Sequence, residues 1–195
     1  TRGRRLDIVV EDNMRDTIEE ALDAVDVAVR LPDVGERRKR VEAAIELLKA
    51  NGAATPTREY RYALAYAIYF HPDPVASEEL ADRVEKLLLS VLEEQPDDCL
   101  SHLYLGHNRY DRRDMAGAQA AFLAARECET DSYTRTKVFE MLACCAVAIN
   151  GIGGALAEVA AYASYTESVD SADVWPSVLA KSIFDALRME RLEPK

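Results

Sequence analysis

The side chains best suited to hold a metal ion are Cys99 and His102, which stand three residues apart, with His107 further along the same stretch. On a helix, Cys99 and His102 would share one face. His107 would lie about 140° around the helix axis from His102, because successive residues are about 100° apart. A structural zinc ion takes four ligands, and the sequence offers no second Cys/His pair to complete the set. We therefore expect no metal site.

The four cysteines are Cys99, Cys128, Cys144 and Cys145. Their spacing matches neither a zinc site nor the cysteine framework of a small secreted protein. Cys144 and Cys145 are adjacent, so on a helix they would point in different directions and would not form a redox pair. This usage is typical of buried thiols in a reducing compartment, and we expect a cytoplasmic protein.

The glycine-rich segment Gly151–Gly154 has one feature of a phosphate-binding loop, its glycine content. Such loops follow a strand and end in Lys and Ser or Thr, whereas this segment follows a predicted helix and lacks those residues. We expect it to be a turn. No nucleophilic serine motif, zinc-binding His-Glu motif or isolated carboxylate pair stands out elsewhere. The sequence therefore predicts no enzymatic activity and no cofactor.

The formal net charge of the chain is −11 at pH 7. A surface that binds nucleic acid or an anionic membrane needs a basic face to displace counterions from phosphates, so we expect neither partner. The one basic run, Arg37–Arg40, is predicted to be the solvated face of a helix, with a recognition patch as the alternative. The basic start of the chain is not followed by an apolar core, and no apolar run approaches the length of a membrane span, so we expect neither a signal peptide nor a membrane segment.

The elements that must position these residues are helices, because alanine and leucine dominate and long alternating apolar and polar runs are absent. We predict an all-α chain that forms a single domain over residues 1–195. Residues 1–11 are unassigned, and within them only Leu6–Val10 could extend as a strand. Four antiparallel hairpins are predicted at about 13–51, 56–95, 97–130 and 133–168, followed by a capping helix at about 172–190.

The predicted helix ends rest on local signals. Asp33 followed by Glu36 has the arrangement of a capping box, and Asn51-Gly52 is predicted to supply a left-handed stop. Thr55-Pro56 and Asp73-Pro74 each place a capping residue before a proline, which is tolerated in the first turn of a helix. These signals divide the first half of the chain into two hairpins.

The stretch 97–130 carries a repeat pattern. Leu105-Gly106 is followed twelve residues after the glycine by Ala118, and Phe122 closes the pattern four residues later. Small residues at 106 and 118 would let two helices cross closely, while the larger side chains fill the seam. The stretch thereby resembles a tetratricopeptide repeat. It departs from the family pattern at three positions: His102 replaces Trp, Arg109 replaces Tyr, and Thr130 replaces Pro.

The resemblance implies a right-handed superhelical array of antiparallel hairpins whose first helices line a concave, peptide-binding face. Carrying the register over to neighbouring hairpins implies the following partner-binding residues: Tyr62, Tyr66, Tyr69, Leu103, His107, Tyr110, Lys137 and Met141. The three tyrosines are spaced by four and three residues, so helical geometry alone places them in one row. A row of this kind suits a binding surface, and the alternative is that it belongs to the core.

We therefore predict an adaptor or scaffold that holds a peptide or a helix of another protein in a concave groove. The alternative is a regulatory or neutralising protein, of the toxin-immunity or secretion-chaperone type, that covers a basic partner with an acidic surface. A contiguous patch of carboxylates on the convex side or at one end would favour the alternative, while a neutral aromatic concave face would favour peptide capture. A third possibility is that the array is the sensor part of a longer protein, which the first residue, Thr1, would permit.

Overall fold

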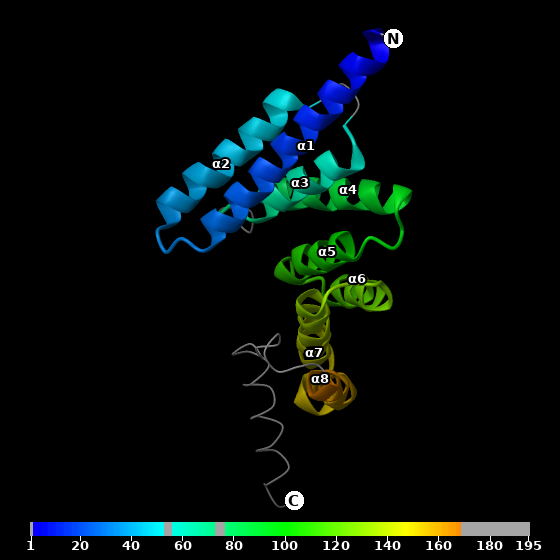
Figure 1. Cartoon of the computed structure of the whole chain (residues 1–195). Helices are drawn as coiled ribbons and strands as arrows, with labels where there is room; N and C mark the ends of the chain where they lie inside the picture. The colour runs from blue at the N-terminus through cyan, green and yellow to red at the C-terminus, as the bar shows by residue number, and fades with distance from the viewer. Residues whose placement is uncertain (1, 53–55, 73–76, 169–195) are drawn as a thin grey trace, which may run out of the picture. The chain divides into compact units, whose positions relative to one another are not determined.

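The computed structural model describes residues 2–52, 56–72 and 77–168, and of residues 2–13 it describes the backbone alone. This part of the chain is all-α, with eight helices packed as consecutive antiparallel pairs (Figure 1). The helices are α1 (Arg2–Val29), α2 (Val34–Asn51), α3 (Arg58–Tyr69), α4 (Glu78–Glu94), α5 (Cys99–Asp111), α6 (Met115–Glu127), α7 (Ser132–Gly154) and α8 (Leu156–Ser168).

Six of the described helices are preceded by a residue whose side-chain oxygen accepts a hydrogen bond from the backbone N–H three residues further on. This interaction satisfies one of the N–H groups that a helix start leaves without a partner. The predicted cap at Asp33 is confirmed, since Asp33 Oδ1 lies 2.7 Å from the nitrogen of Glu36. The other capping residues are Thr57, Ser77, Asp98, Asp114 and Asp131.

The chain divides into two compact units, which we call the N-terminal unit (Thr1–Pro96) and the C-terminal unit (Asp97–Lys195). In the N-terminal unit, α1 pairs with α2 and α3 pairs with α4, and α3 also packs against both helices of the first pair. The core of this unit consists of small and branched side chains, among them Val25, Val41, Leu48, Ile68 and Leu88, each 2% exposed or less.

In the C-terminal unit, α5 pairs with α6 and α7 pairs with α8, while α7 also packs against α6. Phe122 and Leu142 are fully buried, and they belong to one core cluster that also contains Ala118 and Val138. Gly106 is buried on α5, and a methyl group placed on it would lie 2.5 Å from Cε1 of Phe122. The predicted close crossing within 97–130 is thus present, and Phe122 is the residue that occupies it.

Several predicted boundaries were wrong. Helix α1 begins at Arg2 rather than at about 13, and it includes Leu6–Val10 within the segment that had no assignment. No proline occurs before Pro32, so nothing stops a helix that has already nucleated, and each added residue extends it at little cost. The third helix begins two residues later than the Thr55-Pro56 signal, because Thr57 is the residue that caps it.

The predicted turn at Gly151–Gly154 is present as a kink. Gly151 has φ 73° and ψ 177°, a backbone conformation that glycine adopts without strain. The chain then enters α8 at Leu156. The predicted capping helix at 172–190 lies outside the described residues, and the single-domain organisation stays a prediction. None of the described helices combines the length and the apolar character that crossing a membrane requires.

Candidate functional site

The predicted tyrosine row, Tyr62, Tyr66 and Tyr69, lies along one side of α3 in the N-terminal unit. The ring centroids of Tyr62 and Tyr66 are 6.0 Å apart. Phe70 extends the row, with its ring 4.8 Å from that of Tyr66 and 5.0 Å from that of Tyr69, both edge to face. All four side chains are half-buried. The row is therefore neither a sealed core nor a set of isolated surface rings.

Tyr66 is also tied to the first hairpin. Its hydroxyl donates a short hydrogen bond to Oδ1 of Asp26 on α1, and Asp26 is exposed. A hydroxyl bonded to a carboxylate has a fixed direction, so the ring of Tyr66 is held in place while part of it remains accessible. The row is thus a preorganised aromatic surface at the contact between α1 and α3.

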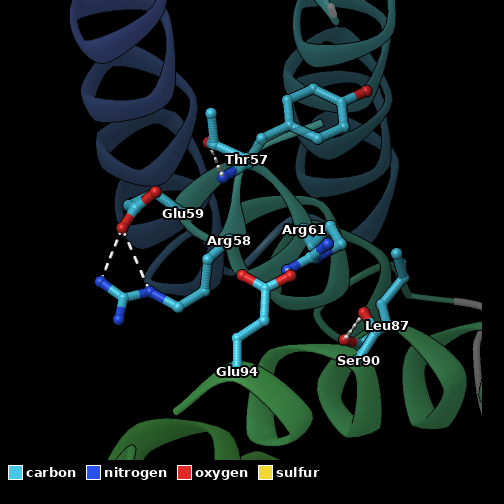
Figure 2. Close-up of polar contacts among 8 residues, drawn as sticks. Thr57, Arg58, Glu59, Arg61, Leu87, Ser90 and Glu94 are labelled. Carbon is cyan, nitrogen blue, oxygen red and sulfur yellow. Dashed lines mark hydrogen bonds and ion pairs between the residues drawn. The ribbon is translucent and has the colours of Figure 1, made fainter. Parts of the chain in front are cut away.

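Polar contacts hold the N-terminal end of α3 (Figure 2). Oγ1 of Thr57 accepts a hydrogen bond from the backbone N–H of Tyr60 at 3.2 Å and thereby caps the helix. Arg61 forms an ion pair with Glu94 of α4, joining the two helices of the hairpin. Arg58 binds Glu59, and backbone hydrogen bonding followed by the Arg58 guanidinium lowers the pKa of the Glu59 carboxyl. These contacts set the position of the helix that carries the tyrosine row.

A second surface feature adjoins the tyrosine row. Helix α1 carries an acidic row whose members are all exposed and fall within about 120° of the helix circumference at about 100° per residue. The members of this acidic row are Asp16, Glu19, Glu20, Asp23 and Asp26. Asp26 is the residue that meets Tyr66. Sequence analysis did not select the acidic row, although its helical spacing was a sufficient signal.

Two predicted contact residues of the C-terminal unit lie in its core. Leu103 is 5% exposed and Met141 is 8% exposed, and both belong to the cluster around Phe122. Tyr110 is half-buried and packs against the same cluster. In this structure the three side chains contribute packing within the unit, so the surface they offer to a partner is small.

His107 is a neutral side chain at the edge of that cluster. Its ring makes an edge-to-face contact with Phe122, with 5.3 Å between ring centroids, and lies 6.1 Å from the ring of Tyr104. Burial lowers the pKa of His107 to about 4, and the nearby Glu140 carboxylate acts in the opposite direction by raising it. At neutral pH the imidazole is therefore uncharged.

Lys137 is held on α7 by two neighbours. Its ammonium lies 3.1 Å from a carboxylate oxygen of Glu140 and 5.7 Å from the centroid of the exposed Tyr133 ring. Glu140 is only 6% exposed, so the pair places one buried charge beside one accessible charge. Sequence analysis missed Glu140. The signal that marks it is a carboxylate three residues from Lys137 among the apolar side chains of α7.

The cysteines are buried thiols, as their types and spacing had indicated. Sγ of Cys99 donates to the carbonyl of Ala125 at 3.5 Å. Burial raises the pKa of Cys144 to about 12 and that of Cys145 to about 11, so both stay protonated at neutral pH. Within residues 2–52, 56–72 and 77–168 no three metal-ligating side chains come together.

Comparison of the chain with protein-family models, with curated proteins and with solved structures found no match. The findings therefore identify an all-α chain of consecutive hairpins and do not identify a family. Its function has to be inferred from the surfaces described above.

Proposed function

We propose that the chain is a protein-interaction module that binds a segment of another protein across the tyrosine row of α3. The observation that carries this proposal is the state of Tyr66, whose hydroxyl is held by Asp26 while its ring stays half-buried among other aromatic rings. A rigid aromatic surface gives a partner large contact area at a small cost in side-chain entropy. Interface residues that dominate binding are commonly of this kind.

We further propose that the hairpins form a tetratricopeptide-like array. Two features support this. Helix α3 packs against both helices of the preceding pair, as the first helix of each new repeat does in a stacked array. Gly106 and Phe122 make the close crossing that the repeat pattern requires. The concave groove of such an array would then take the partner segment.

The residues proposed to touch the partner are those that the structure leaves accessible. In the N-terminal unit they are Tyr62, Tyr66 and Tyr69, and in the C-terminal unit the ammonium of Lys137. His107 and Tyr110 contribute through the edges that remain exposed. Leu103 and Met141 act from within the core by holding the helices in place.

The chemistry of the partner follows from the two rows. The tyrosine row offers aromatic area, and the adjoining acidic row offers four carboxylates in addition to Asp26. A segment that combines apolar side chains with lysine or arginine matches both. Because the carboxylates are exposed and screened by salt, they would speed association and set orientation more than they would add affinity.

The second candidate function is a neutralising protein that covers a basic partner. The acidic row on α1 is the observation that favours it, since it is a contiguous set of exposed carboxylates. In this case the carboxylates, rather than the aromatic rings, would carry most of the binding, and affinity would fall steeply with salt.

One experiment separates the two functions. The partner is captured from native lysate and identified by mass spectrometry, and its affinity is then measured for two variants. One variant changes Tyr62, Tyr66 and Tyr69 to Ala, and the other changes Asp16, Glu19, Glu20 and Asp23 to their amides. Peptide capture predicts the larger loss for the tyrosine variant, whereas neutralisation predicts the larger loss for the amide variant. Leu123→Ala is the control, because Leu123 is an exposed apolar side chain on α6 that lies outside both rows and is not among the proposed contacts.

A further inference from the structure

The N-terminal unit contains a pocket of about 180 Å³ where α2, α3 and α4 meet. Its apolar walls come from one residue of each helix, Ile45, Ile68 and Leu80. Among the described residues, the ionisable side chains of its rim are Glu42, Glu46, Lys49, His71 and Arg83. Pockets for drug-sized ligands or large cofactors measure about 300–1,000 Å³. This pocket is smaller, so it suits a ligand no larger than one amino acid.

The ionisable side chains of the rim differ in the contacts that they already make. Glu46 is paired with Lys49 at 2.8 Å, and Glu42 lies 3.4 Å from Nε2 of His71. Arg83 differs, because within the described part of the chain it makes no hydrogen bond or ion pair. A guanidinium beside an apolar cavity can hold a carboxylate through two parallel hydrogen bonds. The rim therefore has one cationic group available to a ligand.

We propose that this pocket binds a small aliphatic carboxylic acid, of the size of an aliphatic amino acid. The carboxylate pairs with Arg83, and the aliphatic chain lies on Ile45, Ile68 and Leu80. A ligand whose only charge is an ammonium fits less well, because it leaves Arg83 without a carboxylate and places a second cation beside it. If the ligand also carries an ammonium group, Glu42 is the rim carboxylate able to accept it, because Glu46 already pairs with Lys49 and the side chain of Glu42 is 55% exposed.

The pocket is separate from the tyrosine row. Ile68 lies about 120° around α3 from Tyr62 at about 100° per residue, and the row contributes nothing to the pocket lining. Ligand binding here is thus a property additional to partner binding, and either can be lost without the other.

The test is a titration of the ¹⁵N-labelled protein followed by NMR, with isovalerate as the probe. Saturable shifts are expected for amides of α2 and α4 near the pocket. Isopentylamine has the same aliphatic shape with an ammonium in place of the carboxylate, and it should bind at least tenfold more weakly. Arg83→Gln should weaken isovalerate binding at least tenfold. Lys86→Gln should leave it within twofold, because Lys86 is an exposed cation one turn further along α4 and does not line the pocket.

L-leucine distinguishes the two sources of such a carboxylate. If leucine binds more tightly than isovalerate and loses that gain in Glu42→Gln, the ligand is an amino acid. Equal binding of the two would mean a simple carboxylic acid, and either result supports the site. The proposal is overturned if isovalerate gives no saturable shifts, if isopentylamine binds equally well, or if Arg83→Gln binds isovalerate as the unchanged protein does.

Discussion

Gly106 of α5 faces the ring of Phe122 of α6 so closely that a side chain at position 106 has no room. A methyl group there would lie 2.5 Å from Cε1 and 2.7 Å from Cζ of Phe122. Phe122 is fully buried and cannot move outward without disturbing its cluster. Overpacking of this kind costs about 1–3 kcal/mol. We expect Gly106→Leu to lower the free energy of unfolding by at least that amount in urea denaturation.

Gly153→Ala is the control for this prediction. A methyl group at Gly153 would meet nothing within 4 Å, and alanine favours a helix over glycine by about 1 kcal/mol or less. Its free energy of unfolding should be unchanged or slightly raised. If Gly106→Leu were as stable as the unchanged protein, the close crossing of α5 and α6 would be contradicted.

The stability of the protein should depend on pH through His107. Its pKa is about 4 in the folded protein and 6.5 when unperturbed. Between these values the unfolded chain binds a proton that the folded chain does not, so acidification favours unfolding. The free energy of unfolding should therefore fall by about 3 kcal/mol as the pH drops from 6.5 to 4.

His107→Gln should flatten this part of the pH profile, measured by urea denaturation at intervals of pH. The carboxyls of Glu59 and Asp131 also have lowered pKa values, but their ordinary values are 4.5 and 3.8, so they act at lower pH. An identical slope between pH 6.5 and 5 in the variant and the unchanged protein would show that His107 is not the responsible group.

The thiols should react slowly in the folded protein. Cys144 and Cys145 are buried, and their raised pKa values leave little of the reactive thiolate at pH 8. With Ellman's reagent, the rate of labelling should rise by orders of magnitude when denaturant is added. Rapid labelling of Cys144 in the native protein, identified by peptide mapping, would contradict the burial of this part of α7.

Sequence reasoning succeeded where the signal is local. Asp33 caps α2 because a carboxylate can reach the N–H three residues on, and this requires only two nearby residues. Helices α1 and α2 end near the predicted Pro32 and Gly52, but the predicted left-handed conformation of Gly52 was wrong, since its φ is −61° and ψ 124°. Residues 2–12 were missed because a helix can extend through a segment that has no clear apolar pattern of its own.

The candidate site was harder to predict because exposure depends on neighbouring helices. The spacing of Tyr62, Tyr66 and Tyr69 placed them on one face, but only the contact with Asp26, forty residues earlier in the chain, shows how Tyr66 is held. Leu103 and Met141 had the spacing of surface residues in the proposed register, yet they are buried against α6 residues of the cluster around Phe122. Periodicity gives the face of a helix and does not give what covers it.

The hydrogen bond between Tyr66 and Asp26 can be tested apart from partner binding. Tyr66→Phe removes the hydroxyl and keeps the ring, so the free energy of unfolding should fall by about 1 kcal/mol, the usual net contribution of one hydrogen bond. Asp26→Asn should cost less, since the amide oxygen can still accept. A thermal or urea titration of both variants checks this, and no loss in Tyr66→Phe would mean that the bond does not hold the ring in place.

The most direct test of the proposed function is the affinity of the captured partner for Tyr66→Ala, measured by calorimetry beside the free energy of unfolding of the same variant. Because Tyr66 is half-buried, its truncation should cost less than the 3–5 kcal/mol typical of a packed aromatic residue, and the protein should remain folded. Binding should weaken by about 2 kcal/mol or more, as for a central aromatic contact. Undiminished binding by folded Tyr62→Ala, Tyr66→Ala and Tyr69→Ala variants would contradict the account.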